Sequence, residues 1–124
     1  MSKIIHTTDA PEAIGPYSQA VTVGNLVFTS GQIAINPKSG NVEATTIEAQ
    51  TEQVCQNLKA VLEASGSSLE KVVKTVCFLR NMEDFAAFNG VYAKYFTGKP
   101  ARSCVAVRQL PKDVLVEIDT IAEI

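Results

Sequence analysis

Histidine and cysteine are scarce in this 124-residue sequence, which contains one histidine, His6, and three cysteines. A single histidine argues against Ser-His-Asp triads, histidine-activated thiols and metal sites built from histidine. The cysteines, Cys55, Cys77 and Cys104, are odd in number, widely spaced and without a Cys-x-x-Cys pair. Neither a disulfide framework nor a zinc site is therefore expected, and a reducing, cytoplasmic environment is predicted.

Long apolar runs and a strong excess of one charge are also absent. No segment approaches the ~20 apolar residues that a membrane span requires, and residues 1–15 contain no apolar core of the kind found in a signal peptide. The formal net charge is −2 at pH 7, which argues against nucleic acid as a partner. No linker or repeat divides the chain, so residues 1–124 are predicted to form one domain.

Motifs that bind cofactors are missing too. The sequence contains no P-loop, no dinucleotide-binding glycine loop, no nucleophile elbow and no zinc-ligand spacing. Gly98 and Lys99 are not part of a Walker motif, because the upstream glycine that such a motif requires is absent. The residues therefore offer no support for cofactor-dependent chemistry, and we expect neither a metal nor an organic cofactor.

Apolar residues at helical spacing predict two amphipathic helices. The first begins near residues 45–46, where Thr45 and Glu48 fit a capping box, and ends at Gly66, which suits a left-handed stop. The second begins near Asn81, a favourable N-cap residue, and carries a largely aromatic stripe. We interpret that stripe as core packing rather than as a binding cage.

Strand-like patterns cover residues 3–7, 19–23, 26–30, 72–79, 102–108 and 114–122. Gly24-Asn25 joins the second and third of these segments as a tight hairpin. The order of elements predicts an α/β (α+β) sandwich in which two helices cover one face of a mixed sheet. Because several strands are apolar on both sides, the uncovered face is expected to meet another subunit of a homo-oligomer.

Two charged residues interrupt apolar strands between residues 100 and 118, namely Arg102 and Glu117. A buried charge is costly unless it is paired or hydrogen-bonded, so each residue needs a structural partner or a polar ligand. Arg102 has a planar fork of donors that suits a carboxylate or a phosphate, and a structural salt bridge is an equal alternative. Glu117 could act on a water as general base, or could pair with a cation on a neighbouring strand.

Other polar residues also leave two interpretations open. Cys104 follows Arg102 by two residues, so both side chains should face the same side of the strand. A nucleophilic thiol would need a histidine or another activator, and His6 is the only histidine of the chain, so we favour a small buried hydrophobic role for Cys104. Three further side chains could line a cleft or be ordinary core and surface residues, namely Tyr17, Ser30 and Asn89.

Five short motifs are spread over the whole chain: AIGPYSQA at residues 13–20, TSGQ at 29–32, PARSCV at 100–105, LPKD at 110–113 and VEI at 116–118. Together they are similar to the motifs of the RidA family, also called YjgF or L-PSP. The resemblance implies a chorismate-mutase-like fold, assembled as a homotrimer with clefts between neighbouring subunits. It also implies hydrolysis of reactive 2-imino acids to 2-keto acids and ammonia without a cofactor. The implied substrates are 2-iminobutanoate and the 2-iminopropanoate that is derived from 2-aminoacrylate.

The same resemblance implies roles by position. Arg102 would bind the substrate carboxylate, Glu117 would position or activate the attacking water, and the backbone at Cys104 would contact the imine nitrogen or the water. Four residues would line the cleft, namely Tyr17, Ser30, Gly31 and Asn89. The segment 97–99 is shorter than the equivalent loop of many relatives, which bears on substrate size. Two alternatives stay open: a non-catalytic trimer that binds small carboxylates, and the endoribonuclease or translation-inhibitor role attributed to some relatives, which the acidic balance disfavours.

Overall fold

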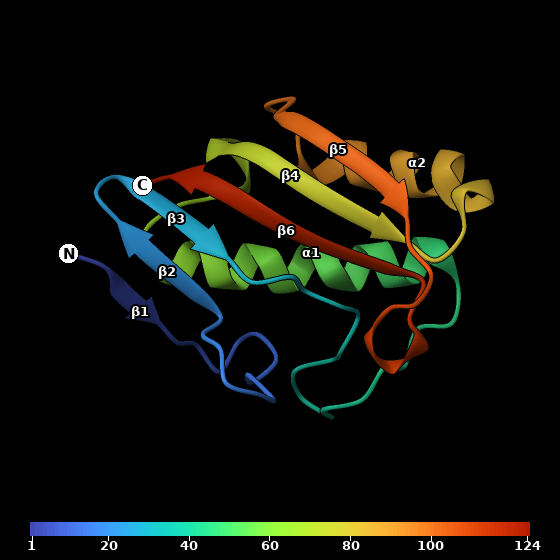
Figure 1. The fold of residues 1–124 in the computed structure, drawn as a ribbon, viewed down its shortest axis with the longest axis horizontal. Helices are drawn as coiled ribbons and strands as arrows, with labels where there is room; N and C mark the ends of the chain where they lie inside the picture. Colours follow the sequence, from blue (N-terminus) through green and yellow to red (C-terminus); the bar gives the residue numbers. More distant parts are fainter.

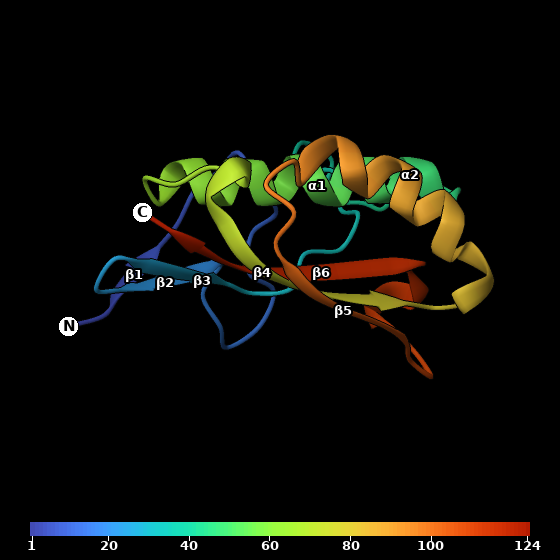
Figure 2. The ribbon, with the colours of Figure 1, turned by 90° about the horizontal axis from the view of Figure 1, so that it is seen from above.

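The computed structural model describes all residues 1–124 and shows a six-stranded sheet with two helices on one face (Figure 1). The strands are β1 (Lys3–Ile5), β2 (Ala20–Val23), β3 (Leu26–Thr29), β4 (Val72–Leu79), β5 (Ala101–Ala106) and β6 (Val116–Glu123). The helices are α1 (Ile47–Ala64) and α2 (Phe85–Tyr95), with short 3-10 turns η1 (Leu69–Lys71), η2 (Met82–Asp84) and η3 (Pro111–Asp113). Both helices lie on the same side of the sheet, as predicted (Figure 2). No helix combines the length and the apolar character needed to cross a membrane.

The strands lie in the order β1-β2-β3-β6-β4-β5, so the last strand of the chain is in the interior of the sheet. Only β4 and β5 are parallel, because the segment between them contains α2, the kind of crossover that a parallel pair requires. All other neighbouring strands are antiparallel. The predicted mixed sheet is confirmed, and β5 is an edge strand with one free side.

The start of α1 corrects one prediction. The N-cap is Thr46, whose Oγ1 accepts a hydrogen bond from the N–H of Ala49 at 3.1 Å. The predicted capping box of Thr45 and Glu48 is wrong, because with the cap at Thr46 the glutamate occupies the second helical position rather than the third. At the other end, Gly66 has the left-handed φ of 82° that was predicted for the stop.

The remaining boundaries differ from the predictions by a few residues. Asn81 does accept a hydrogen bond from the N–H of Glu83 at 2.9 Å, but it caps η2, and α2 begins only at Phe85. β6 begins at Val116 rather than at residue 114, because η3 occupies the residues just before it. Lys112 within η3 has a positive φ of 54°, which no apolar pattern could reveal.

The core lies between the helices and the sheet. Its fully buried side chains include Val54, Leu58, Leu62, Leu79, Phe88, Val116 and Ile118. The opposite face of the sheet carries no helix (Figure 2). Apolar side chains such as Phe28 and Val105 are exposed there in a single chain. This uncovered face agrees with the apolar character that the strands show on both sides.

Candidate functional site

Arg102 lies on β5, half-buried, with its side chain beneath α2. Its Nη1 donates a hydrogen bond to Oδ1 of Asn89 at 2.7 Å. Its Cζ lies 4.8 Å from the ring centroid of Tyr92 and 5.4 Å from that of Phe85, distances typical of cation–π contacts. The chain's two ion pairs are His6–Glu12 and Arg80–Asp113, so Arg102 has no carboxylate partner within its own chain.

A cavity of about 390 Å³ opens beside this guanidinium. It is formed by α2 and by the segment leading into β5, and its polar lining residues are Asn89, Tyr92, Thr97, Lys99 and Arg102. The short segment 97–99 therefore borders this cavity. Two cationic side chains and no acidic one line the cavity, so it is suited to an anion.

Cys104 shares this side of the strand, and burial raises the pKa of its thiol although the charge of Arg102 acts in the opposite direction. The thiol is therefore held in its unreactive protonated form. Its backbone is more informative. Val107 N–H donates to the carbonyl of Leu79 on β4, so alternation along the strand directs the N–H and C=O of Cys104 to the free edge of the sheet.

Glu117 lies on β6 on the uncovered face, half-buried. Burial, with a smaller contribution from the charge of Asp119, raises the pKa of its carboxyl group. The carboxylate packs directly against the backbone of Gly31, where any Cβ would overlap Oε2 of Glu117. The absence of a side chain at Gly31 therefore makes room for the carboxylate of Glu117.

A β-bulge brings Gly31 to this position. Phe28 pairs with Ile121, and the next backbone bridge between the two segments pairs Gln32 with Ile118. Four steps along one segment thus oppose three along the other, which leaves one extra residue around Ser30 and Gly31. The hydroxyl of Thr29 bridges the gap by accepting a hydrogen bond from Thr120 N–H at 3.0 Å.

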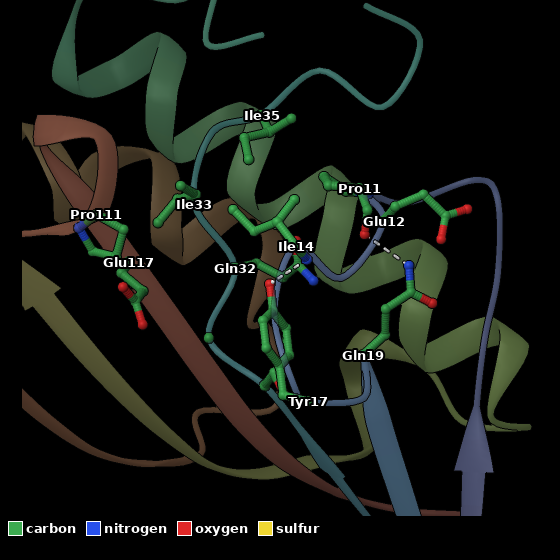
Figure 3. A pocket seen from close by; sticks show the side chains of 12 residues that line it. Pro11, Glu12, Ile14, Tyr17, Gln19, Gln32, Ile33, Ile35, Pro111 and Glu117 are labelled. Carbon is green, nitrogen blue, oxygen red and sulfur yellow. Dashed lines mark hydrogen bonds between the residues drawn. The ribbon is translucent and has the colours of Figure 1, made fainter. Parts of the chain in front are cut away.

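A cavity of about 370 Å³ lies at Glu117 (Figure 3). It collects four of the predicted site residues, Tyr17, Ser30, Gly31 and Glu117, and much of its remaining wall is apolar, including Ile14, Ile33, Ile35 and Pro111. The hydroxyl of Ser30 donates to the carbonyl of Ser18 at 2.6 Å, which ties the bulge to the segment before β2. The hydroxyl of Tyr17 accepts from Ile14 N–H at 3.4 Å (Figure 3).

Arg102 and Glu117 point to opposite faces of the sheet. Arg102 is the partner of Thr75 in the β4–β5 pair, and Glu117 is the partner of Phe78 in the β4–β6 pair. Thr75 and Phe78 are three residues apart on β4, and side chains alternate between the faces at every residue. Within one chain, Arg102 and Glu117 therefore neither neutralise each other nor meet across one small ligand.

Residues 7–124 match the sequence profile of the family described as Endoribonuclease L-PSP. The chain belongs to the L-PSP family. It is 50% identical over 126 residues to the 2-iminobutanoate/2-iminopropanoate deaminase of Escherichia coli, with 98% of each chain covered. It is 52% identical over 123 residues to a Lactococcus lactis protein named for a regulatory role, AldR, with 98% of each covered. The structure of Escherichia coli TdcF with bound serine is similar with a TM-score of 0.94 at 43% identity, covering 98% of both chains.

The L-PSP resemblance read from the five motifs is thus confirmed, but buried polar residues that shape the site were missed. Asn57 of α1 is 1% exposed and donates to the carbonyls of Ile33 and Ile35 at 3.1 and 2.9 Å, which fixes the wall of the Glu117 cavity. Gln19 holds the neighbouring segment, donating to the carbonyl of Pro11 at 2.8 Å. The available signal was the position of Asn57 within the apolar stripe of α1, where a polar residue needs a partner.

Proposed function

We propose that this L-PSP protein hydrolyses reactive 2-imino acids to 2-keto acids and ammonia. The substrates are 2-iminobutanoate and the 2-iminopropanoate that forms from 2-aminoacrylate. The observation that carries the proposal is Arg102, a half-buried cation without a carboxylate partner in its own chain, held by an amide and two aromatic rings. Such a fixed guanidinium suits bidentate binding of the carboxylate that every 2-imino acid carries. The 50% identity to a protein named as an imino-acid deaminase supports the same substrate class.

The reaction needs an oriented water and a group that moves its protons. The water oxygen forms a bond to the imine carbon while Glu117 takes one proton from it, and the C=N electrons move to nitrogen. In the resulting carbinolamine the C–N bond then breaks as the carbonyl forms. Both protons of the water end on nitrogen, which leaves as ammonia. Because the imine carbon is already electrophilic, holding it beside this water supplies much of the acceleration.

The other predicted residues serve this geometry. A raised pKa makes Glu117 a better proton acceptor than an ordinary glutamate. The free backbone groups of Cys104 at the sheet edge contact the imine nitrogen or the water. Four residues line the cleft, namely Tyr17, Ser30, Gly31 and Asn89. No step calls for a metal or an organic cofactor.

The complete site requires two chains. Because Arg102 and Glu117 of one chain face opposite sides of the sheet, we propose that neighbouring subunits of a homotrimer each supply one of them to a shared cleft. The apolar side chains on the uncovered face supply the surface that such an assembly would bury. We place this trimer in the cytoplasm, in keeping with its three free cysteines.

Two other functions have specific support and are weaker. A regulator that binds small carboxylates without turning them over would use the same Arg102 clamp, and a relative at 52% identity is named for a regulatory role. An endoribonuclease is suggested by the family's description. The net charge of −2 argues against the latter, because RNA binding depends on clustered cationic side chains.

The deciding experiment generates 2-aminoacrylate in situ and follows the release of pyruvate with and without the protein. We expect wild type to accelerate hydrolysis over buffer, and Arg102→Ala and Glu117→Gln to abolish most of the acceleration. Wild type no faster than buffer would reject the enzyme and favour the carboxylate-binding function. Full activity in Arg102→Ala would reject the carboxylate clamp. An RNA cleavage that survives both substitutions would be assigned to a contaminant or to another site.

A further inference from the structure

We propose that Tyr92 is a positioning residue for Arg102. Thr75 and Phe96 restrain the ring of Tyr92, and this ring holds the guanidinium in the orientation that binds the substrate carboxylate. The inference rests on the proposed function, because it assumes that Arg102 binds a carboxylate. It assigns to Tyr92 an effect on carboxylate affinity, exerted through Arg102, and no contact with the reacting atoms.

The first step is the contact between the two side chains. The guanidinium carbon of Arg102 lies 4.8 Å from the centroid of the Tyr92 ring, nearer than to the ring of Phe85 at 5.4 Å. A free arginine side chain has many rotamers, and ordering them opposes binding. A guanidinium held over a ring and hydrogen-bonded to Asn89 has already lost much of that freedom, and its remaining N–H groups are available to a carboxylate.

The second step is what fixes the ring. The hydroxyl of Tyr92 is 2.8 Å from Oγ1 of Thr75, which is 0% exposed, and Tyr92 itself is 8% exposed. Phe96 stacks on the ring, with centroids 4.5 Å apart and planes inclined by 25°. Burial raises the pKa of the Tyr92 hydroxyl, so the hydroxyl stays protonated and able to donate. The ring is thus restrained at its polar tip and on one face.

The third step is that the same strand pair fixes both partners. Thr75 is the β4 residue directly opposite Arg102 in the parallel ladder. Thr75 therefore fixes the hydroxyl of Tyr92 through its side chain and is paired with the backbone of Arg102 in the sheet, so the two groups keep a constant relative position. Asn89, which accepts the hydrogen bond from Arg102, precedes Tyr92 by three residues on α2 and so shares its face of the helix. The helix presents an amide and a ring to the guanidinium from one side.

The test compares two tyrosines of the same helix by titrating the assembled protein with pyruvate in a calorimeter. Tyr92→Leu removes the ring beneath Arg102. Tyr95→Leu makes the same change three residues later, where the hydroxyl contacts Gln56 and Glu52 of α1. The cation–π contacts of Arg102 are with Phe85 and Tyr92 and do not include Tyr95. We expect the Kd for pyruvate to rise about tenfold in Tyr92→Leu, the range of a desolvated cation–π contact, and to stay within about twofold in Tyr95→Leu.

Kinetics separate positioning from general damage. KM for the imino acid should rise with the Kd in Tyr92→Leu, while kcat changes little, because Tyr92 does not act on the reacting atoms. An unchanged pyruvate affinity in folded Tyr92→Leu, or an equal loss in both leucine variants, would overturn the inference. Wild type that binds pyruvate but hydrolyses no imine would overturn the enzymatic proposal and leave this one standing. Wild type that neither binds pyruvate nor accelerates hydrolysis of the imine would overturn both.

A second pair of variants covers the case in which Tyr92→Leu does not fold. Tyr92→Phe and Thr75→Val each break the same hydrogen bond while keeping the bulk of the side chain. Each should weaken pyruvate binding by about two- to threefold, and the double variant should be no weaker than either single one, because only one bond is lost. Effects that add, or no effect in any of the three, would contradict the role assigned to Tyr92.

Discussion

The two halves of the proposed site are built in different ways. The Arg102 half rests on regular elements, a parallel strand pair and the helix that connects it, and its charge is left without a carboxylate partner. The Glu117 half rests on the segments before β2 and after β3, joined to the sheet by a bulge, and its carboxylate is pressed against a glycine. One half is a rigid clamp and the other is a shaped pocket, so different substitutions should break them.

The largest expected effect comes from separating the halves and recombining them. Arg102→Ala and Glu117→Gln should each lower kcat/KM by about a hundredfold or more, from loss of a bidentate charge-assisted contact and of a general base, respectively. If each cleft takes Arg102 from one subunit and Glu117 from its neighbour, about one quarter of all clefts are intact in an equimolar, randomly assembled mixture of the two variants. Pyruvate release by the co-refolded mixture measures this recovery.

The recovery decides between a shared and a single-chain site. A mixture no more active than the average of its two inactive parents would show that both residues must belong to one chain. That result would contradict the opposite orientations of Arg102 and Glu117 in the sheet. Refolding each variant alone is the control, because both samples pass through the same treatment without gaining a complementary partner.

Gly31→Ala should damage only the Glu117 half. The new Cβ overlaps the carboxylate, so Glu117 must move, and we expect kcat to fall by about tenfold or more while affinity for pyruvate at Arg102 is largely retained. Gly90→Ala is the matched control, since the residue lies within α2 and a Cβ there meets nothing within 4 Å beyond its chain neighbours and the helix's own backbone. That control should be neutral or slightly stabilising. Equal losses from both substitutions would contradict the role given to Gly31.

The fold was largely readable from the sequence because apolar periodicity reports directly on burial. Strand 72–79 and the stop at Gly66 were placed correctly for this reason. The cap of α1 was misplaced because Thr45 and Thr46 carry the same hydroxyl, and only the backbone decides which one leaves the helix. Arg102 and Glu117 stood out because a charge in an apolar strand is visible without any coordinates.

What pairs with these charges could not be read in the same way. The opposite orientation of the two residues depends on the register of β4 with both its neighbours, which no local pattern encodes. The partners of Tyr92 and Asn57 lie 17 and 22 to 24 residues away in the sequence. A hydroxyl or amide predicted to be buried can be expected to have a hydrogen-bond partner, but only the three-dimensional fold identifies that partner.

Substitution of Asn57 tests how strongly this residue stabilises the Glu117 half. Asn57→Ala removes two buried hydrogen bonds. It leaves the carbonyl of Ile35 without a donor, whereas the carbonyl of Ile33 still accepts from Ile35 N–H at 2.8 Å, and we expect the free energy of unfolding to fall by about 2–4 kcal/mol. Chemical denaturation measures this loss. Gln56→Ala, at the adjacent and exposed position, should cost less than about 1 kcal/mol. Similar costs at the two positions would show that the segment 33–35 is held by packing rather than by the amide.

The smallest expected effect concerns the pKa of the Glu117 carboxyl group. If Glu117 is the base, kcat/KM should fall as the pH drops through its raised pKa, and so at higher pH than for an ordinary glutamate. Asp119→Asn removes the like charge and should lower that pKa, moving the acidic limb of the pH–rate profile to lower pH. The shift is partial, because burial is the larger cause. Glu123→Gln, an exposed change on the same strand, should leave the limb in place.

The raised pKa of Asp119 also predicts how stability depends on pH. Burial raises the pKa of Asp119 above its ordinary value, so the folded chain holds this proton more tightly than the unfolded chain does. Stability from this group is present at low pH and is lost as the pH rises through the raised pKa. Asp119→Asn should therefore unfold at higher temperature than wild type at neutral pH and lose this advantage in acid. An advantage that persists in acid would mean that Asp119 acts through packing rather than through its charge.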